Sequence, residues 1–593
     1  MISVRLVGAN LHVQTPFSDV EKARGIPQRR WLKASKVWAC RPSLANMDYI
    51  AHTWPEATWC DASVRTFREA QQEAKQRVRI AARNIPGLPD ELRDVGIEKF
   101  DDEYKRGLFK GRPLWKHQKR ALLLGRDMPY FAYIMDQGTG KTRTILDDAA
   151  HNFRNGRIDA LIILNKNSVK TNWVADDHNP DEPDAVDMWL PDDVPRAKVV
   201  WISDANKSEQ AEFQRFLDMV GEKRVLLVLS INYDALNMDR AYKTLEEFCT
   251  RRKVMIVADE STMIGRPGSD RTKHAIKLRK LCRIARIATG TPIVKSPLKA
   301  YTQYAFLSED VLGFGSFYAF KAHYCIMGGF QGRQVLKHVN LDELSNKIAS
   351  CSFRVLKSEC LDLPPKVYPP KRRVYMTKDQ MRAYSDMRET MLAEAKGKTS
   401  TAMIELTKVM RLQQITGGYL TADDGSVIEL VKPKNNPLMQ EVLGIVEEAG
   451  DQKVLVWAHF KAEIRALVTL LEEQGYKVAE FHGDVPERQR LQVRRDFKNG
   501  LYDVLVGNQA AGGMGIDEFK IASIVIYYSN SYDTEARIQS EDRTHRGGSE
   551  MHDAVTYYDL VVPNTVRVRI IQTLRANKSI SDEVMRDGLS EWI

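Results

Sequence analysis

The residues Gly138-Thr139-Gly140-Lys141-Thr142 form the most specific chemical motif in this sequence. An apolar run, Phe131–Met135, precedes the motif and a helical pattern follows it, which is the setting of a loop that binds nucleotide phosphates. The glycines let backbone N–H groups approach phosphate oxygens at the positive end of a helix. Lys141 can reach the β- and γ-phosphates, and Thr142 can ligate Mg²⁺. The motif predicts an ATP and Mg²⁺ site; the alternative is an isolated Gly-rich turn.

Two acidic residues end a second apolar run about 120 residues later, Val254–Ala258 followed by Asp259 and Glu260. Asp259 could hold Mg²⁺, directly or through water, and Glu260 could orient and deprotonate an attacking water. Thr289 and Thr291 follow the next apolar run, and their hydroxyls could sense a γ-phosphate beside the acids. The alternative for the two acids is a solvated loop without a catalytic role. The alternative for the two threonines is an ordinary polar turn after a strand.

Glycines and arginines mark the third region. Gly512, Gly513 and Gly515 follow the apolar run Val504–Val506, and they could bring the backbone close to ATP or to a nucleic-acid phosphate. Arg543 and Arg546 are spaced i and i+3, so on a helix they would share one face, which suits a transition-state phosphoryl group. An isolated pair at this spacing is more typical of a solvated helix. If one half of the chain binds ATP and the other supplies arginines, ATP would close the cleft between them.

Short apolar runs alternate with helical segments in two stretches of the chain, and this alternation predicts α/β units with parallel sheets. The stretch between them reads as mostly helical. We expect five parts: an N-terminal accessory domain at 1–100, an ATP-binding lobe at 101–300, a helical insertion at 301–435, a second lobe at 436–565 and a C-terminal brace helix at 566–593.

Composition excludes several classes of protein. The chain has 593 residues, 43% of them hydrophobic and 28% charged, as in globular proteins and unlike disordered or collagen-like chains. No apolar run reaches the roughly 18 residues that a membrane span needs, and the N-terminus lacks a signal core. The seven cysteines form no C-x-x-C pair, so we expect no zinc site. A net charge of +10 favours a polyanionic partner.

Taken in order, these motifs resemble those of superfamily-2 helicase-type motors, and specifically the Swi/Snf-type double-stranded-DNA translocases. The resemblance covers roughly residues 110–580 and rests on Trp115–Gln118, Gly138–Thr142, Leu161–Leu164 with Trp173, Asp259–Thr262, Thr289–Pro292, Val454–Phe460, Phe481–Asp484 with Arg488, Ala511–Gly515 and Gln539–Arg546. It implies an α/β fold with two RecA-like parallel-sheet lobes, a helical insertion between them and a small N-terminal accessory domain.

The resemblance also implies residue roles. Gln118 would read adenine, Gly515 and Asp517 would join the phosphate loop in binding the nucleotide, and Gln539 would join Thr289 and Thr291 in coupling hydrolysis to motion. Contacts to the DNA backbone are implied for Lys166, Ser168, Ser230, Lys461, Gly512 and Gly513. Such contacts would make binding depend on salt and hardly on sequence.

The chain departs from the family pattern at four positions. Ser261-Thr262 replace the usual Ala-His after the acidic pair, Lys166 replaces a proline, and Arg567 replaces a glutamate. The change at Ser261-Thr262 puts in doubt the coupling to the γ-phosphate that these two positions provide in the family, although the acidic pair itself is present.

The N-terminal segment is rich in tryptophan and loosely resembles the small domain of annealing helicases in the fork-remodelling branch. Aromatic rings beside Arg29, Arg30, Lys33 and Lys36 could stack on bases while the cations hold phosphates. The alternative is that the tryptophans form the core of a small domain. Both can hold, with different tryptophans in each role.

The sequence favours a DNA-dependent ATPase of the Swi/Snf type that translocates on double-stranded DNA and remodels or anneals branched or protein-bound DNA. The alternatives are a strand-separating DNA or RNA helicase and a non-hydrolysing DNA-binding scaffold with a vestigial nucleotide site. We expect ATP and Mg²⁺ as cofactors, double-stranded or branched DNA as the partner, no membrane association and a monomer. The expected location is the cytoplasm of a bacterial or phage-infected cell, or the nucleus in a eukaryote.

Overall fold

The computed structural model describes residues 2–8, 10–27, 29–84, 88–167, 170–175, 183–202, 207–219, 224–290, 297–329, 334–395, 402–422, 424–511 and 518–576. The chain divides into two compact units. Unit 1 comprises residues 1–135, 142–164 and 185–354, and unit 2 comprises residues 136–141, 165–184 and 355–593. None of the helices in this described part combines the length and the apolar character needed to cross a bilayer.

A small sheet with the strand order β3-β4-β2-β1-β5 forms the N-terminal part of unit 1. Its elements are β1 (Ser3–Val7), β2 (Asn10–Gln14), α1 (Val20–Ala23), β3 (Arg30–Leu32), β4 (Val37–Cys40), α2 (Leu44–Thr53) and β5 (Thr58–Trp59). Trp54 lies in the core of this domain and is 1% exposed. Trp31 is 45% exposed, and its ring centroid lies 4.9 Å from that of Trp38. The tryptophans therefore divide between core and surface.

A single helix, α3 (Asp61–Arg83), joins this sheet to the rest of unit 1. Near its start, Phe67 packs against the small sheet's core. Near its end, the Arg77 guanidinium lies 5.0 Å from the ring centroid of Tyr130. Asn84, just past the helix, donates to the backbone carbonyls of two later residues at 2.6 and 2.9 Å. The helix thus contacts both cores, and the short helices α4 (Asp90–Arg93) and α5 (Lys99–Lys105) follow it.

The main sheet of unit 1 has the strand order β14-β6-β11-β10-β7-β9-β8. The strands are β6 (Tyr130–Met135), β7 (Ala160–Asn165), β8 (Arg196–Val200), β9 (Leu226–Asn232), β10 (Val254–Asp259), β11 (Ile284–Thr289) and β14 (Ser352–Val355). The pairs β6–β11, β11–β10, β10–β7 and β8–β9 are parallel. Four of these strands (β6, β7, β9 and β11) are buried along their whole length, which explains the continuous apolar runs in the sequence.

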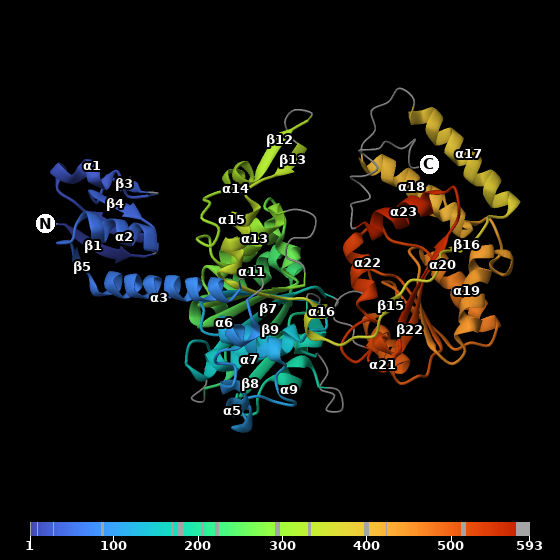
Figure 1. Cartoon of the computed structure of the whole chain (residues 1–593), viewed down its shortest axis with the longest axis horizontal. Helices are drawn as coiled ribbons and strands as arrows, with labels where there is room; N and C mark the ends of the chain where they lie inside the picture. The colour runs from blue at the N-terminus through green and yellow to red at the C-terminus, as the bar shows by residue number, and fades with distance from the viewer. Residues whose placement is uncertain are drawn as a thin grey trace. The chain divides into compact units, whose positions relative to one another are not determined.

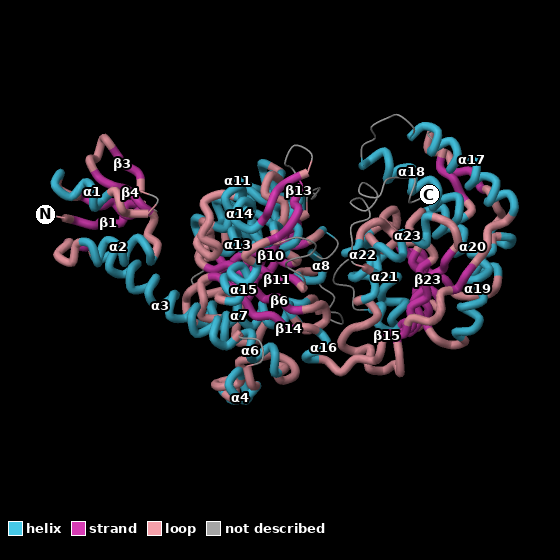
Figure 2. Tube along the Cα trace, turned by 45° about the horizontal axis from the view of Figure 1, so that its top comes forward, coloured by secondary structure: helices cyan, strands magenta, loops and turns pink. Residues whose placement is uncertain are grey.

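Helices enclose this sheet, as the cyan and magenta colours of Figure 2 show. They are α6 (Lys116–Gly125), α7 (Lys141–Arg154), α9 (Ala185–Trp189), α10 (Lys207–Leu217), α11 (Asp239–Arg251), α12 (Asp270–Arg279) and α13 (Leu298–Leu307). Alternate residues of β6, β7, β9, β10 and β11 share one apolar core with α11, α12 and α13. Helix α7 begins inside the phosphate-loop motif, at Lys141.

The stretch 301–435 contains helices, as expected, but also several strands. Its helices are α14 (Phe317–Tyr324), α15 (Leu341–Ala349), α16 (Lys357–Cys360), α17 (Lys378–Ala395) and α18 (Ala402–Gly417). Its further strands are β12 (Cys325–Gly328), β13 (Gln334–His338), β15 (Lys366–Val367), β16 (Arg372–Arg373), β17 (Tyr419–Thr421) and β18 (Val427–Glu429). The prediction of a mostly helical insertion missed these strands, of which β14 extends one main sheet and β15 and β16 extend the other. Strands of two to five residues are too short to show periodicity.

The sheet of unit 2 has the order β15-β23-β22-β19-β21-β20, with β16 also pairing with β23, and its strand pairs are parallel. Its later strands are β19 (Lys453–Trp457), β20 (Val478–Phe481), β21 (Val504–Gly507), β22 (Ala522–Tyr527) and β23 (Val555–Val561). Helices α19 (Pro437–Ala449) and α20 (Lys461–Glu473) cover one face and α21 (Glu487–Lys498) covers the other (Figure 1). The predicted fold class, with two RecA-like parallel-sheet lobes, is confirmed.

The remaining helices of unit 2 are α8 (Lys170–Trp173), α22 (Thr534–Glu541) and α23 (Val566–Arg575). Helix α23 begins where the brace helix was expected, and residues 577–593 lie outside the described part of the chain. Its Val566, Ile570 and Leu574 share a small core with residues of α17 and α18, such as Tyr384 and Leu412.

A fully buried ion pair fastens α7 to the main sheet of unit 1. Arg286 of β11 and Asp148 of α7 are both 0% exposed, and their Nε and Oδ2 atoms are 2.6 Å apart. The Tyr133 hydroxyl donates to Oδ2 of Asp148 at 2.7 Å, and Arg286 also donates to the Gly125 carbonyl at 3.0 Å.

We predict that Arg286→Met strongly destabilises the chain, because it leaves the Asp148 carboxylate buried without its cation. Breaking one side of such a pair typically costs about 3–5 kcal/mol. The measurement is the midpoint of urea unfolding, with Arg251→Met as the control, since Arg251 pairs with Glu247 on the exposed face of α11. Equal midpoints for the two variants would contradict the assignment.

Candidate nucleotide site

Three adjacent parallel strands of unit 1 end at one edge of the sheet. In register, Asp259 of β10 pairs with Ala288 of β11, and Thr289 of β11 pairs with Ile134 of β6. Because parallel strands point the same way, the ends of β6, β11 and β10 lie together, and ligands of α/β sheets bind at this carboxyl edge. The phosphate-loop motif follows β6 directly.

The loop after β6 has the backbone geometry that phosphate binding needs. Gly138 and Gly140 have φ angles of +82° and +83°, a region that other residues rarely adopt. The Thr139 hydroxyl donates to the Asp136 carbonyl at 2.7 Å and holds the loop in a tight turn. Helix α7 begins at Lys141, so the positive end of its dipole is directed at the loop.

The acidic pair ends β10 in a constrained conformation. Glu260 is a non-glycine residue with a φ of +50°, and it is 8% exposed. Its Oε2 accepts a hydrogen bond of 3.4 Å from the Thr289 hydroxyl. The Asp259 carbonyl accepts one of 2.7 Å from the Tyr233 hydroxyl, and burial raises the pKa of that phenol well above its ordinary value. Strain of this kind costs about 1–3 kcal/mol and is concentrated at functional sites.

The donor set at this edge fits a magnesium ion held between protein and nucleotide. Thr142 lies in the first turn of α7 and Asp259 is the last residue of β10, so the sheet's carboxyl edge carries a hydroxyl and a carboxylate. Mg²⁺ takes oxygen ligands and usually uses only one or two protein groups, with phosphates and water completing its octahedron. Their roles as metal ligands remain predictions.

Gln118, predicted to read adenine, is 2% exposed on α6. Its Oε1 accepts from the Trp115 backbone N–H at 2.9 Å and so caps its own helix. Arg143, which sequence reasoning missed, holds the segment before Trp115. Its guanidinium donates to the carbonyls of Lys110, Arg112 and Pro113 and lies 4.9 Å from the Trp189 ring. Arg143 therefore links the helix of the phosphate loop to the segment that carries Gln118.

The prediction that Arg543 and Arg546 share a helix face was wrong. Helix α22 ends at Glu541, and both arginines lie in the turns that follow it. Arg543 is 1% exposed. Within unit 2, a Cβ added to Gly138 would lie 2.9 Å from the Cβ of Arg546, so glycine permits this close approach of the loop backbone. Their role toward phosphate remains a prediction.

Lys357 of α16 holds the turn that carries Arg543 and Arg546. No sequence motif predicted this role. Lys357 is 8% exposed, and its Nζ donates to Asp542 Oδ1 at 2.8 Å and to the His545 carbonyl at 2.7 Å. Its backbone N–H donates to Asp136 Oδ2 at 2.9 Å. Burial lowers the pKa of Lys357 from its ordinary value. One lysine thus connects residues from three distant segments of unit 2.

The predicted DNA contacts have different outcomes. Ser230 lies inside β9 and is 0% exposed, so it offers no surface to a DNA backbone, and this prediction needs correction. Lys461 opens α20 on the surface, where its Nζ lies 2.7 Å from Asp484 Oδ1. Lys166 follows β7 and is half-buried. The roles of both lysines remain predictions.

Gln539, predicted to couple hydrolysis to motion, lies on α22 and is 9% exposed, with its amide donating to Glu535 at 3.1 Å. Its role stays a prediction. The remaining predicted residues lie outside the described residues: Ser168, Thr291, Gly512, Gly513, Gly515 and Asp517.

A buried acid, Glu463 of α20, lies beside the loop that leads to Lys461. Its Oε2 accepts from the Phe460 backbone N–H at 3.4 Å and from the Ser529 hydroxyl, and its Oε1 lies 3.8 Å from Arg567. Burial raises the pKa of Glu463 to about 7. Burial lowers the pKa of the neighbouring His459 to about 4. Sequence reasoning missed Glu463 because its partners lie up to 104 residues away.

Two family models match the chain. The SNF2-related domain matches residues 60–417, and the helicase conserved C-terminal domain matches residues 433–548. The chain belongs to the SNF2-related family. The match to the SNF2-related domain includes the phosphate loop and the acidic pair, and the helicase domain match includes Arg543 and Arg546. Residues before 60 lie outside both matches.

Several known proteins are similar to this chain over different shares of its length. An uncharacterized ATP-dependent helicase of Mycoplasma pneumoniae is 24% identical over 376 residues, which cover 62% of this chain and 34% of that protein. The ATP-dependent RNA helicase dbp3 of Aspergillus terreus is 35% identical over 165 residues, which cover 27% of this chain and 32% of dbp3. The chain thus spans about a third of the length of these relatives. The Sulfolobus solfataricus SWI2/SNF2 ATPase core in complex with dsDNA is 20% identical, with a TM-score of 0.34 and coverage of 81% of this chain and 94% of that one.

We predict that Arg143→Lys raises the KM for ATP about tenfold and changes kcat less. Lysine keeps the charge beside Asp147 but cannot hold three carbonyls, and each lost hydrogen bond is worth about 1 kcal/mol. Steady-state ATPase kinetics measure this, and the control is the exposed Arg240→Lys of α11. A fall in kcat with an unchanged KM would show that Arg143 does not position the segment before Gln118.

We predict that Glu463 makes the stability of the chain fall as pH rises. Its pKa is raised in the folded state, from an ordinary 4.5 to about 7, so its stabilising contribution is complete below pH 4.5 and is lost as pH rises through about 7. Glu463→Gln should remove this part of the slope. Urea midpoints from pH 4 to 8 measure it, and His459 titrates in both proteins, so it cancels in the comparison. Parallel curves would contradict the prediction.

Proposed function

We propose that the chain is a DNA-dependent ATPase of the Swi/Snf type, which couples ATP hydrolysis to translocation on double-stranded DNA. The observation that carries the proposal is that Asp259, Glu260 and Thr289 meet at the sheet edge where β6 ends, shortly before the phosphate-loop motif in the sequence, in a chain that belongs to the SNF2-related family. Remodelling or annealing of branched or protein-bound DNA is the finer part of the proposal.

Each residue has a defined task in this proposal. Lys141 and the loop backbone bind the β- and γ-phosphates, and Glu260 positions a water and accepts its proton. Mg²⁺, when bound to Thr142 and Asp259, neutralises phosphate charge. Arg543 and Arg546 stabilise charge that develops on the transferred phosphoryl group. The Thr289 hydroxyl, already bonded to Glu260, senses the change of state at the acidic pair.

The N-terminal sheet supplies a second contact to nucleic acid in this proposal. The hairpin of β3 and β4 exposes Trp31 together with Arg30, Lys33 and Lys36, while Trp54 remains in the core. An exposed ring among cations suits base stacking with phosphate contacts, and each stacked base is worth about 1–3 kcal/mol.

We predict that Glu260→Gln lowers the ATPase rate at least about 100-fold while leaving ATP and DNA binding intact. The amide keeps the size of the side chain but cannot accept the proton of the attacking water. The measurements are phosphate release and filter binding of nucleotide and duplex. Glu212→Gln, an exposed change on α10, is the control. A wild-type rate in the Glu260 variant would support a non-hydrolysing scaffold instead.

We predict that duplex or branched DNA stimulates the ATPase more than single strands or RNA, and that stimulation falls steeply with salt because phosphate contacts release counterions. A panel of linear duplex, fork, four-way junction, R-loop, single strand and RNA tests this. The similarity to dbp3 makes RNA the decisive competitor. Stimulation by RNA alone would replace the proposal with an RNA helicase.

A further inference from the structure

Lys357 links the base of the phosphate loop to the turn 542–546, and all of these residues belong to unit 2. Its backbone N–H donates to Oδ2 of Asp136, the first residue after β6, at 2.9 Å. Its Nζ donates to Asp542 Oδ1 at 2.8 Å and to the His545 carbonyl at 2.7 Å. One residue therefore connects the start of the loop with the turn that carries the two arginines.

A second backbone bond holds this link at the loop. The Asp136 N–H donates to the carbonyl of Val355, two residues before Lys357, at 3.2 Å. The Asp136 carbonyl in turn accepts from the Thr139 hydroxyl at 2.7 Å, inside the loop. Lys357 therefore binds the same residue that closes the tight turn of the loop.

The chain after α16 contacts the turn through other groups. His545 Nε2 donates to the Pro364 carbonyl at 2.9 Å. Lys366 Nζ lies 3.2 Å from Glu541 Oε2 and 3.9 Å from Asp542 Oδ1. These contacts come from outside α16, so the turn keeps partners when the lysine of α16 is replaced. A variant at that lysine should therefore fold.

The turn departs from helical hydrogen bonding where Lys357 binds it. In a continued helix the His545 carbonyl would accept from the Ser549 N–H. The Ser549 N–H donates instead to the Arg546 carbonyl at 2.8 Å, and the His545 carbonyl accepts from Lys357. The lysine thus occupies an acceptor that a longer α22 would use, and it favours the turn over a helix.

The turn lies close to the loop backbone at Arg546. A Cβ added to Gly138 would be 2.9 Å from the Arg546 Cβ and 3.6 Å from the Gly547 backbone nitrogen. The Lys357 side chain is buried, so water competes little for its bonds to the turn. These bonds therefore help to fix the distance between the turn and the loop.

We propose that Lys357 is a positioning residue for ATP hydrolysis, which holds Arg543 and Arg546 at the distance from the phosphate loop that the reaction needs. Hydrogen bonds from a cation are stronger than neutral ones, so a buried lysine suits this task. Misplacing a catalytic group by about 1 Å can cost about 100-fold in rate. The inference rests on the proposed function, because it assumes that this loop and these arginines hydrolyse ATP.

A double-mutant cycle in single-turnover ATPase assays of the full chain, with duplex DNA present, tests this inference. Lys357→Met should lower the hydrolysis rate constant about 100-fold. The half-saturating ATP concentration should change less than about twofold, because the backbone N–H of residue 357 still binds Asp136. In the background Arg543→Gln/Arg546→Gln, the same substitution should lower the remaining rate less than about threefold, since the groups through which Lys357 acts are gone. Losses that simply multiply would overturn the proposal.

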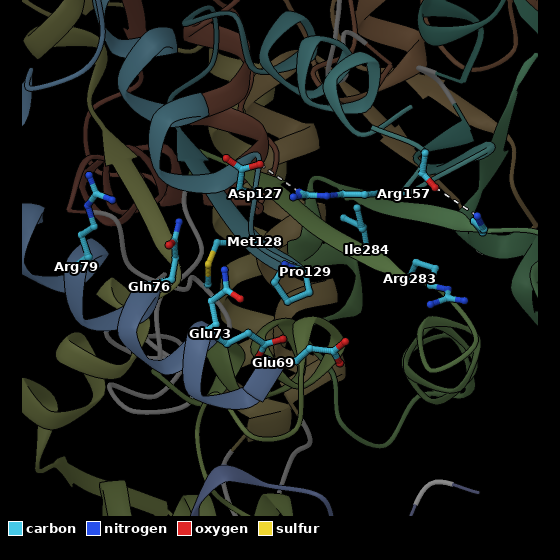
Figure 3. A pocket seen from close by; sticks show the side chains of 13 residues that line it. Glu69, Glu73, Gln76, Arg79, Asp127, Met128, Pro129, Arg157, Arg283 and Ile284 are labelled. Atoms are coloured by element: carbon cyan, nitrogen blue, oxygen red, sulfur yellow. Dashed lines mark hydrogen bonds and ion pairs between the residues drawn. The ribbon is translucent and has the colours of Figure 1, made fainter. Parts of the chain in front are cut away.

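Two controls remove a cation elsewhere. Lys371→Met changes an exposed lysine in the segment that follows α16, and Arg283→Met changes an exposed arginine just before β11. Figure 3 shows Arg283 at one side of a cavity in unit 1, at the opposite end of β11 from Thr289. Both variants should hydrolyse ATP within about twofold of the wild-type rate. A loss in either control as large as that in Lys357→Met would attribute the effect to net charge and overturn the proposal.

Amide hydrogen exchange without nucleotide separates this inference from the proposed function. The turn 542–549 should exchange at least about tenfold faster in Lys357→Met than in the wild type, and β22 should exchange equally in both. Equal exchange of the turn, together with ATP hydrolysis by the wild type, would refute the positioning role alone. A wild type that hydrolyses no ATP with any nucleic acid would refute the proposed function, and the positioning role with it.

Discussion

The chemistry of unit 1 depends on the parallel register of β6, β11 and β10. A shift of one residue in either pairing would turn buried side chains to the other face, and a shift between β11 and β10 would also separate Thr289 from Glu260. The register holds because these strands are mostly apolar and are covered by helices. The charged residue inside them, Arg286 of β11, is buried and paired with Asp148. Asp259 and Thr289 end their strands, so the carboxyl edge of the sheet brings them together.

The helix after the phosphate loop is held by polar contacts inside the protein rather than by apolar packing alone. Asp148 bonds to Arg286 and Tyr133 on the sheet side, and Arg143 bonds to three carbonyls on the other side. Asp147 is buried beside Arg143, and burial raises its pKa to about 7. Both oxygens of Asp147 lack a hydrogen bond from any described residue and lie near Arg143 only as an ion pair at 3.5 Å. The hydrogen bonds of Asp148 and Arg143 are the contacts that fix one position of the helix, because buried polar groups are costly when they lose their partners. The phosphate loop leads directly into this helix, so the position of the helix limits where the end of the loop can lie.

The sequence allowed the strands, the phosphate loop and the acidic pair to be predicted, because each follows from a local pattern. It did not predict that α22 stops before Arg543, since nothing between Glu541 and Arg546 breaks a helix. The sequence also did not predict that Ser230 is buried, because a single polar residue in an apolar run resembles the end of a strand. Lys357 and Glu463 were missed for another reason. Their partners come from residues 136, 542 and 567, and contacts at such separations leave no trace in a single sequence.

Two of the residues that depart from the family pattern, Ser261 and Arg567, have a physical role in the fold. The Ser261 hydroxyl donates to Gln303 of α13 at 2.6 Å, so it is satisfied in the interior and does not compete with Glu260. Arg567 bonds to the Tyr528 carbonyl and to the Thr416 hydroxyl and lies 3.8 Å from Glu463. A glutamate at position 567 would place two carboxyl groups together in a buried site, which is costly. The arginine there and the acid on α20 therefore form one unit, and replacing either alone should damage the contact between α23 and the loop before Lys461.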